Sequence, residues 1–259
     1  MEASTVFLLV LLGICTGGMT SLIGASGVMI LIPALSLSMK FTELEAIGTS
    51  LMVDVIGSLA VSYTYFKNSN IDIRNGKWIA LGSVAGAQLG AVFASRIPDT
   101  GLGGAFGIFL MLFGVIVFAR GANASTGPGA RKPLSFQSKW RRIAVSVIIG
   151  FLLGVNSGLL GAGGGINFLL VLLFVMRIPL HKAIGTSTLL MAITALSGAA
   201  GHWEHIDYAA GLVIGAGTIA GGLLGARFAN KVSEKVLGRV AGTVFVALGA
   251  AMTVIKLRG

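Results

Sequence analysis

Long apolar runs dominate the chain, and short segments that carry most of its charge separate them. The runs lie near residues 4–22, 28–39, 44–66, 77–95 and 101–119, and again near 142–160, 166–176, 183–201, 209–229 and 236–255. Most are long enough to cross a hydrocarbon core about 30 Å thick, which takes about 20 helical residues. The pattern predicts an all-α integral membrane protein with roughly eight to ten membrane segments.

Composition supports this class and excludes others. Of the 259 residues, 55% are hydrophobic and 11% charged, with a mean hydropathy of +0.92, whereas a soluble domain usually carries about a quarter charged residues. The net charge of +10 comes from basic residues at run ends and in one central stretch. That is the positive-inside pattern of cytoplasmic loops, and it differs from the basic face of a nucleic-acid binder. Cys15 is the only cysteine, which excludes an intramolecular disulfide.

The two halves of the chain align with each other. A shift of 137 positions lays residues 13–50 on 150–187 without a gap, and a shift of 135 pairs glycines 82, 86 and 90 with 217, 221 and 225. We therefore divide the chain into a first transmembrane repeat at 1–119, a basic linker at 120–140 and a second transmembrane repeat at 141–259. Duplication of this kind is frequent in transporters, whose substrate site lies between the repeats.

The runs at 28–39 and 166–176 are too short to cross the membrane as helices. As half-helices that re-enter, they would leave about four transmembrane helices in each half and make the repeats parallel. If each instead completes a crossing, every half has five segments and the repeats are inverted. The number of basic residues on the linker's side favours the second arrangement, and the sequence leaves both open.

A glycine-rich break precedes each short run. Helix does not easily persist through consecutive glycines, and unpaired backbone N–H groups at membrane depth need protein or a polar cavity around them. A helix that starts after such a break directs its N–H groups and positive dipole end at one spot, which is an anion site. Tight turns between packed helices are the structural alternative; the repetition of the break favours binding.

A Gly-Thr-Ser motif also recurs, at 48–50 and 185–187. We expect it to open a long helix in each half, where Thr and Ser can cap the helix, contact substrate, or do both. The breaks and the motifs supply the candidate substrate-binding residues: Gly24, Ser26, Gly27, Thr49, Ser50, Asn156, Ser157, Gly161, Gly163, Gly164, Gly165, Asn167, Thr186 and Ser187.

Asp54 is the acidic residue that lies inside an apolar run. A carboxylate within the membrane is costly and by default suggests function. Proton coupling is the candidate role, and a hydrogen-bonded structural aspartate is the alternative. The aligned residue of the second half is Met191, so this role would belong to one half only.

Two further patterns could suggest other chemistry. His202, Glu204, His205 and Asp207 cluster between two runs, but a solvated loop explains them better than a metal site because nothing completes a ligand set. Gly24-Ala25-Ser26-Gly27 matches the Gly-x-Ser-Gly of rhomboid intramembrane proteases, for which His202 would be the base. Since Ser26 aligns with Gly163, turn geometry explains that match, and we expect no enzyme, no metal and no cofactor.

At these motifs the sequence resembles the TauE/SafE family of sulfite exporters. In that family each half carries a glycine-rich break, a short apolar helix and then Ala-x-Gly-Thr-Ser, here at 46–50 and 183–187. The first break departs from the pattern, with Ser26 and Val28 in place of glycines. The resemblance covers nearly the whole chain and implies movement of sulfite, thiosulfate or organosulfonates, driven by an ion gradient.

Together these observations predict a multi-pass secondary transporter of the bacterial inner membrane with a cytoplasmic linker. Its expected partners are a small sulfur-containing anion, the lipid bilayer and a coupling proton, without nucleic acid; a homodimer is a candidate assembly. An anion channel and the rhomboid-like protease are the alternative functions.

Overall fold

The computed structural model describes residues 3–39, 41–94, 138–160, 164–233, 235–244 and 246–247. Most of these residues are helical and none lies in a strand, which confirms the all-α prediction. The predicted run at 101–119 and all but the last three residues of the predicted linker lie outside them. The helices are α1 Ala3–Ile23, α2 Val28–Met39, α3 Glu43–Lys67, α4 Ile73–Ala94, α7 Lys139–Leu160, α8 Gly164–Leu170, a π-helical turn Val171–Val175, α9 Leu180–Gly201, a 3-10 turn Trp203–His205 and α10 Tyr208–Lys231.

Four of the described helices are long and apolar enough to cross a membrane: Ala3–Ile23, Leu44–Lys67, Leu180–Gly201 and Tyr208–Lys231. Large apolar side chains such as Phe7, Leu152 and Leu224 point outward and are exposed. Exposure of such a surface to water would be unfavourable, whereas the acyl chains of lipid are as apolar as these side chains and solvate them. The chain is therefore a multi-pass membrane protein, as the apolar runs predict.

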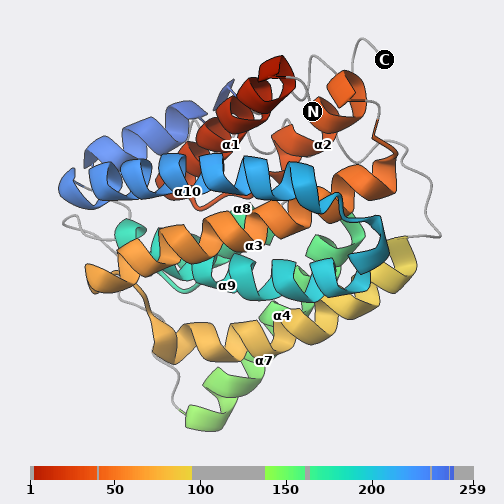
Figure 1. The fold of residues 1–259 in the computed structure, drawn as a ribbon. Helices are drawn as coiled ribbons and strands as arrows, with labels where there is room; N and C mark the ends of the chain where they lie inside the picture. The colour runs from red at the N-terminus through yellow and green to blue at the C-terminus, as the bar shows by residue number, and fades with distance from the viewer. Residues whose placement is uncertain are drawn as a thin grey trace.

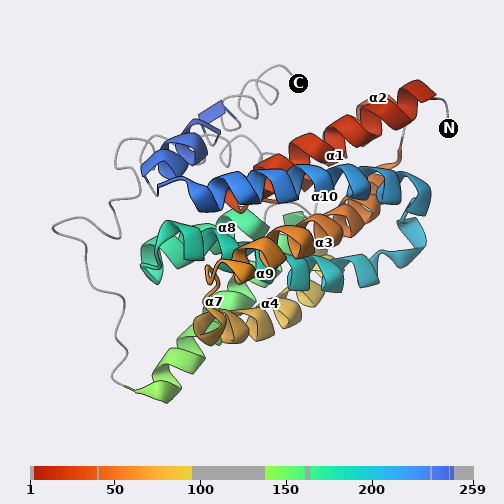
Figure 2. The same ribbon diagram turned by 60° about the vertical axis from the view of Figure 1, so that its left-hand side comes forward.

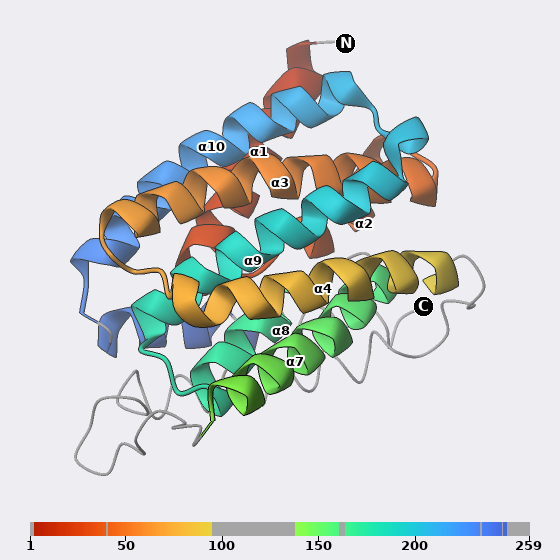
Figure 3. The same cartoon turned by 90° about the horizontal axis from the view of Figure 1, so that it is seen from below.

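The helices form a bundle with α3 and α9 at its centre (Figures 1 and 3). The α1–α10 pair packs on one side of this centre, and the α4–α7 pair packs on the other. Each outer pair joins the first helix of one half to the last described long helix of the other half. The halves are thus interlocked.

Glycines make these outer pairs possible. A Cβ at Gly17 of α1 would lie 2.7 Å from the backbone nitrogen of Gly222 in α10, and one at Gly154 of α7 would lie 2.7 Å from the Cα of Ser83 in α4. No real side chain fits at such distances, so the helix backbones are in direct contact. Because lipid gives helices no hydrophobic drive to associate, close contact of this kind holds a membrane bundle together.

The same contacts give the directions of the helices. In α1 and α10 the contact positions rise together, from Gly13 beside Thr218 to Gly17 beside Gly222, so these helices are parallel. In α3 and α9 they run oppositely, since Gly48 lies by His205 and Gly185 lies by Tyr65. The pairs α4 with α7 and α3 with α10 are parallel. So are α4 and α9, since Gly76 lies by Thr186 and Ser83 lies by Thr194.

The directions of the described long helices agree with one of the two predicted topologies. α1, α3 and α10 run one way, and α4, α7 and α9 run the other way. Each described long helix of the first half is therefore antiparallel to the helix that aligns with it in the second half. For the described long helices, that is the arrangement expected of inverted repeats. The common origin of the halves stays a prediction from the sequence.

The short helix α2 and the break before it return the chain toward the end of the bundle where α1 begins. A Cβ at Gly27 would lie 2.6 Å from the Cβ of Thr16, so the chain has already turned back along α1 where α2 begins. Leu31 and Leu35 then pack in one cluster with Leu9, near the start of α1. α3 then begins at the same end of the bundle as α1. A re-entrant half-helix would instead leave the chain at the end of the bundle where α1 finishes.

Local signals fix where the central helices begin. Thr42 caps α3 through a capping box: its hydroxyl accepts from the Glu45 amide at 3.3 Å, and the Glu45 carboxylate accepts from the Thr42 amide at 2.9 Å. α9 begins directly after Pro179, which lacks an N–H and sets its own φ. The expectation that Gly-Thr-Ser opens these helices is wrong, because both motifs lie inside helix.

The two ends of the bundle carry opposite charge. The end where α3 finishes and α4, α7 and α9 begin carries basic residues: Lys67, Arg74, Lys77, Arg141, Arg142, Arg177, Lys182 and Lys231. The opposite end carries Glu45, Glu204 and Asp207. Basic residues therefore gather at one end of the bundle and acidic residues at the other.

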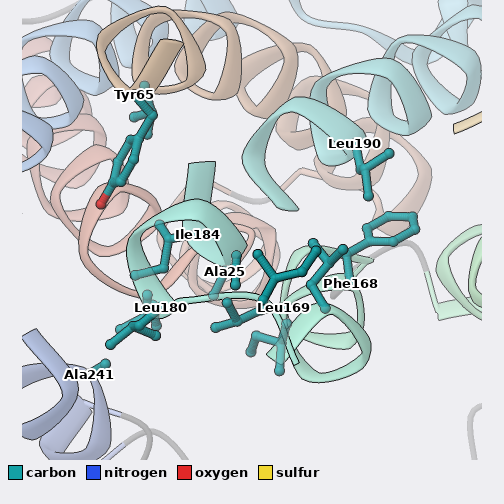
Figure 4. Close-up of a cluster of buried hydrophobic side chains, with 14 of the residues drawn as sticks. Ala25, Tyr65, Phe168, Leu169, Leu180, Ile184, Leu190 and Ala241 are labelled. Carbon is teal, nitrogen blue, oxygen red and sulfur yellow. The ribbon is translucent and has the colours of Figure 1, made fainter. Parts of the chain in front are cut away.

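An apolar core fills the interior around the first break. α8 packs on α9 (Figure 2), and Phe168 and Leu169 join Leu190 in one buried cluster. Ala25 lies beside Ile184 in the same cluster (Figure 4). The break is therefore surrounded by packed protein, as irregular backbone within a membrane must be.

Candidate functional site

The first break, at residues 24–27, lies at the centre of the candidate site. Gly24 adopts a left-handed conformation with φ +61°, which glycine adopts without strain, and its N–H still donates to the Thr20 carbonyl at 2.9 Å. Gly24 packs directly against the Ser187 hydroxyl of α9. The break thus ends α1 sharply and brings the chain against the other half.

The predicted intramembrane carboxylate contacts this break. Asp54, in α3, is 6% exposed. Its Oδ2 accepts from the Ser26 hydroxyl, and its Oδ1 accepts from the Gly27 amide at 3.3 Å. The Val28 amide donates to Ser26 Oγ at 3.1 Å. The donors at the start of α2 therefore converge on one carboxylate, directly or through the serine.

The second break meets the first one. A Cβ at Gly165 would lie 2.5 Å from the Gly24 carbonyl oxygen, 2.5 Å from Met191 Sδ and 2.9 Å from the Ser26 nitrogen. The two breaks are thus in backbone contact between α3 and α9. The thioether of Met191 lies beside the start of α8, as Asp54 lies beside the start of α2.

The rest of the second break is described in part. Asn156 and Ser157 lie near the end of α7, and Ser157 is half-buried. Gly164 begins α8, whereas Gly161 and Gly163 lie outside the described residues. Asn167 is 9% exposed, and among the described residues its Nδ2 has no hydrogen-bond partner.

The two Gly-Thr-Ser threonines make matching contacts across the bundle. Thr49 Oγ1 accepts from the Asp207 amide at 2.9 Å, and Thr186 Oγ1 accepts from the Asp72 amide at 2.9 Å. Each bond joins a central helix of one half to the loop before the fourth helix of the other half. The hydroxyls of both threonines are thus engaged in bonds between the halves, one at each end of the bundle.

The motif serines differ from each other. Ser187 Oγ lies 2.9 Å from the Ile184 carbonyl oxygen and 3.5 Å from that of Gly24. Ser50 is fully buried, and its hydroxyl has no partner among the described residues. Because an unpaired buried hydroxyl is costly, Ser50 has bonding capacity to offer a bound molecule.

The residue that sequence reasoning missed is Ser58. It lies one turn after Asp54 on the same face of α3, is fully buried, and its hydroxyl also lacks a partner in the described part of the chain. The signal was present, since residues 50, 54 and 58 repeat at intervals of four, which places them on one helical face. Together they form a polar track along α3.

The contacts around Ser26 differ from those of a protease. Ser26 donates to Asp54, whereas His202 Nδ1 lies 3.0 Å from the Gly198 carbonyl oxygen at the end of α9. The turn after His202 is at the bundle's acidic end. Within the described ranges no group of three or more His, Cys, Asp or Glu is placed to share a metal ion.

Comparison with known proteins agrees with this architecture. The chain matches the family described as "Sulfite exporter TauE/SafE" over residues 9–252. It is 26% identical to "Probable membrane transporter protein YunE" of Bacillus subtilis, over 93% of this chain and 95% of that protein. It is 24% identical to "Probable membrane transporter protein MJ0441" of Methanocaldococcus jannaschii, over 95% of this chain and 94% of that protein. No solved structure matches the chain.

The family match spans almost the entire sequence, and the described residues form the membrane bundle that a transporter requires. The resemblance predicted from the glycine breaks and the Gly-Thr-Ser motifs is thereby confirmed, and transport rather than catalysis is the family's activity. The chain belongs to the TauE/SafE sulfite exporter family of membrane transporters.

Proposed function

We propose that this protein is a secondary transporter that moves small sulfur-containing anions, such as sulfite, thiosulfate or an organosulfonate, across the bacterial inner membrane. The contact between the two breaks beside the buried Asp54 carries the proposal. It places helix-start donors and a carboxylate at one buried spot between the halves. The Ser50 and Ser58 hydroxyls, which have no partner among the described residues, lie one turn away along α3. Transporters built from inverted repeats bind substrate at such a place.

The chemistry of the spot suits an oxyanion. The Ser26 hydroxyl and the Gly27 amide already hold a carboxylate, which is itself an oxyanion. A sulfite or sulfonate group has the same kind of acceptor oxygens. Ser50 Oγ and Asn167 Nδ2, which have no partner among the described residues, are further candidate donors. The name of the family supports sulfur as the central atom.

Asp54 is proposed to carry the coupling proton. Its buried position and its separation from the basic residues at the bundle ends give it no ion-pair partner among the described residues. A carboxylate in such surroundings can bind and release a proton as the halves rearrange. The described structure supports proton binding in the first half only, because Met191 stands beside the start of α8 where Asp54 stands beside the start of α2.

The proposed orientation puts the basic end of the bundle in the cytoplasm. Lys67, Arg74, Lys182 and Lys231 lie at that end, and positive loops are retained on the cytoplasmic side. The linker would then also be cytoplasmic, since α7 starts there. Antiparallel halves allow each to adopt the other's conformation, which would expose the site alternately to the two sides.

Flux into proteoliposomes tests the proposal. Proteoliposomes that contain the purified protein should take up radiolabelled sulfite. Gly165→Val should abolish this uptake because the valine side chain would force the two breaks apart. Gly18→Val is the matched control, since a Cβ at Gly18 meets nothing within 4 Å. Equal uptake by both variants would refute the site. Single-channel current steps in voltage-clamped bilayers would instead identify an anion channel.

A further inference from the structure

We infer that the site takes a singly charged oxyanion together with one proton, because the Asp54 carboxylate occupies the donors that such an anion needs. The inference rests on the proposed transport function, and it specifies the charge of the substrate and how the proton is coupled to it. It follows from the contacts at the start of α2 and from the distribution of charge in the bundle.

The start of α2 already holds an anion. Ser26 donates its hydroxyl proton to one carboxylate oxygen of Asp54, and Gly27 donates its amide proton to the other at 3.3 Å. The Val28 amide donates to Ser26 Oγ at 3.1 Å and so reinforces the first bond. Asp54 thus occupies the place where the positive end of a helix binds an external anion. A transported anion can use these donors only after the carboxylate gives them up.

No described residue supplies a buried positive charge that could hold two anions there. In the part of the chain that the structure describes, Asp54 is the buried charged residue, and the buried set contains no lysine or arginine. The histidines of α9, His181 and His202, lie at its two ends. The buried Tyr65 donates its hydroxyl to the Ser21 carbonyl at 2.8 Å. Two negative charges in contact would therefore repel each other without compensation.

Protonation of Asp54 both frees the donors at the start of α2 and removes the repulsion between two negative charges. It removes the negative charge, and a neutral carboxyl group is a weaker acceptor that releases the Ser26 hydroxyl and the Gly27 amide. A monoanion that takes its place restores the same net charge that the empty site had. A dianion such as sulfate would leave one further negative charge unbalanced. The site therefore favours hydrogensulfite or an organosulfonate over dianions.

The polar track along α3 gives the incoming anion further partners. Ser50 and Ser58 lie one turn before and one turn after Asp54, and both hydroxyls are buried and unpaired within the described ranges. Buried polar groups normally have partners, so these hydroxyls are suited to a molecule that binds beside Asp54. The aligned positions of α9 carry Ser187, Met191 and Ala195, and so lack such a track.

Proton uptake on binding tests the inference. Methanesulfonate is the probe, because it keeps a single negative charge and exchanges no proton itself near neutral pH. Sodium methanesulfonate is added to purified protein in weak buffer at a series of pH values, while calorimetry measures binding and a pH-sensitive dye measures proton uptake. We expect one proton taken up for each anion bound at pH values where Asp54 starts ionised, and no competition from sulfate.

Three variants test whether Asp54 is the group that takes up the proton. Asp54→Asn should bind methanesulfonate without taking up a proton, and Glu204→Gln, an exposed carboxylate at the bundle end, should behave as wild type. Ser26→Ala should weaken binding but leave the proton count per bound anion unchanged. Binding without proton uptake in wild type at every pH, the same uptake in Asp54→Asn, or equal competition by sulfate would each overturn the inference alone. If sulfite, thiosulfate and methanesulfonate all fail to bind wild type, the proposed function fails and the inference fails with it.

Discussion

Two adjacent glycines of α1 provide a matched test of how the bundle is held together. A Cβ at Gly17 would lie 2.7 Å from the backbone nitrogen of Gly222 and closer still to the Thr218 carbonyl oxygen, whereas ordinary contact begins at 3.4 Å. A Cβ at Gly18 meets nothing within 4 Å. Alanine at position 17 must therefore move α1 away from α10 by at least 0.7 Å.

The expected energies follow from this difference. Overpacking of this kind costs about 1–3 kcal/mol, whereas alanine gains about 0.5–1 kcal/mol over glycine within a helix. Both variants receive the helix gain, and only Gly17→Ala carries the cost of separating the helices. Gly18→Ala should thus equal or exceed the stability of wild type, with Gly17→Ala about 1–3 kcal/mol below Gly18→Ala.

Thermal unfolding in detergent measures the difference. Each variant is heated, and the fraction that remains monodisperse in size-exclusion chromatography gives an apparent melting temperature. Gly17→Ala should melt clearly below Gly18→Ala, and liposome reconstitution should show the same order in uptake. Equal melting temperatures would refute the claim that α1 and α10 are in backbone contact at this point.

Three other predictions concern the cross-bundle bonds and the orientation. Thr186→Val should lower stability by about 1 kcal/mol because it leaves an amide of the α3–α4 loop without its acceptor, and Thr186→Ser should recover the loss in thermal unfolding. Tyr65→Phe should cost about 1 kcal/mol, since the ring is kept and only the hydroxyl bond to α1 is lost; an unchanged melting temperature would contradict this. In a background with Cys15→Ser, a cysteine at Glu204 should react with an impermeant maleimide from the periplasm, and one at Lys231 only after the membrane is opened. The reverse labelling pattern would invert the proposed orientation.

The apolar pattern predicts the helices well because a membrane helix needs a long apolar run. The run at 28–39 coincides with α2, and the run at 44–66 differs from α3 by one residue at each end. The directions of the helices could not be read from run lengths, since a short run can re-enter or cross. They depend on contacts such as Gly27 with Thr16, which bring together residues from separate helices.

The candidate site was predicted in part. Asp54 stands out in the sequence because it interrupts an apolar run, but its bonds to Ser26 and Gly27 join residues on different elements and require the return of the chain through the first break. The prediction that Gly-Thr-Ser opens a helix is wrong for α3, because the Thr42 and Glu45 capping box starts that helix earlier in the chain. Thr49 instead accepts a bond from the opposite half, which no local pattern signals.

The most direct test of the central claim is the accumulation of radiolabelled sulfite in proteoliposomes with and without an imposed pH gradient. Wild type and Glu204→Gln should accumulate sulfite only when the gradient is present, and Asp54→Asn should lose that accumulation while it still exchanges sulfite across the membrane. Accumulation by Asp54→Asn equal to that of wild type, or uptake by wild type that does not respond to the gradient, would contradict a proton-coupled carrier built around Asp54.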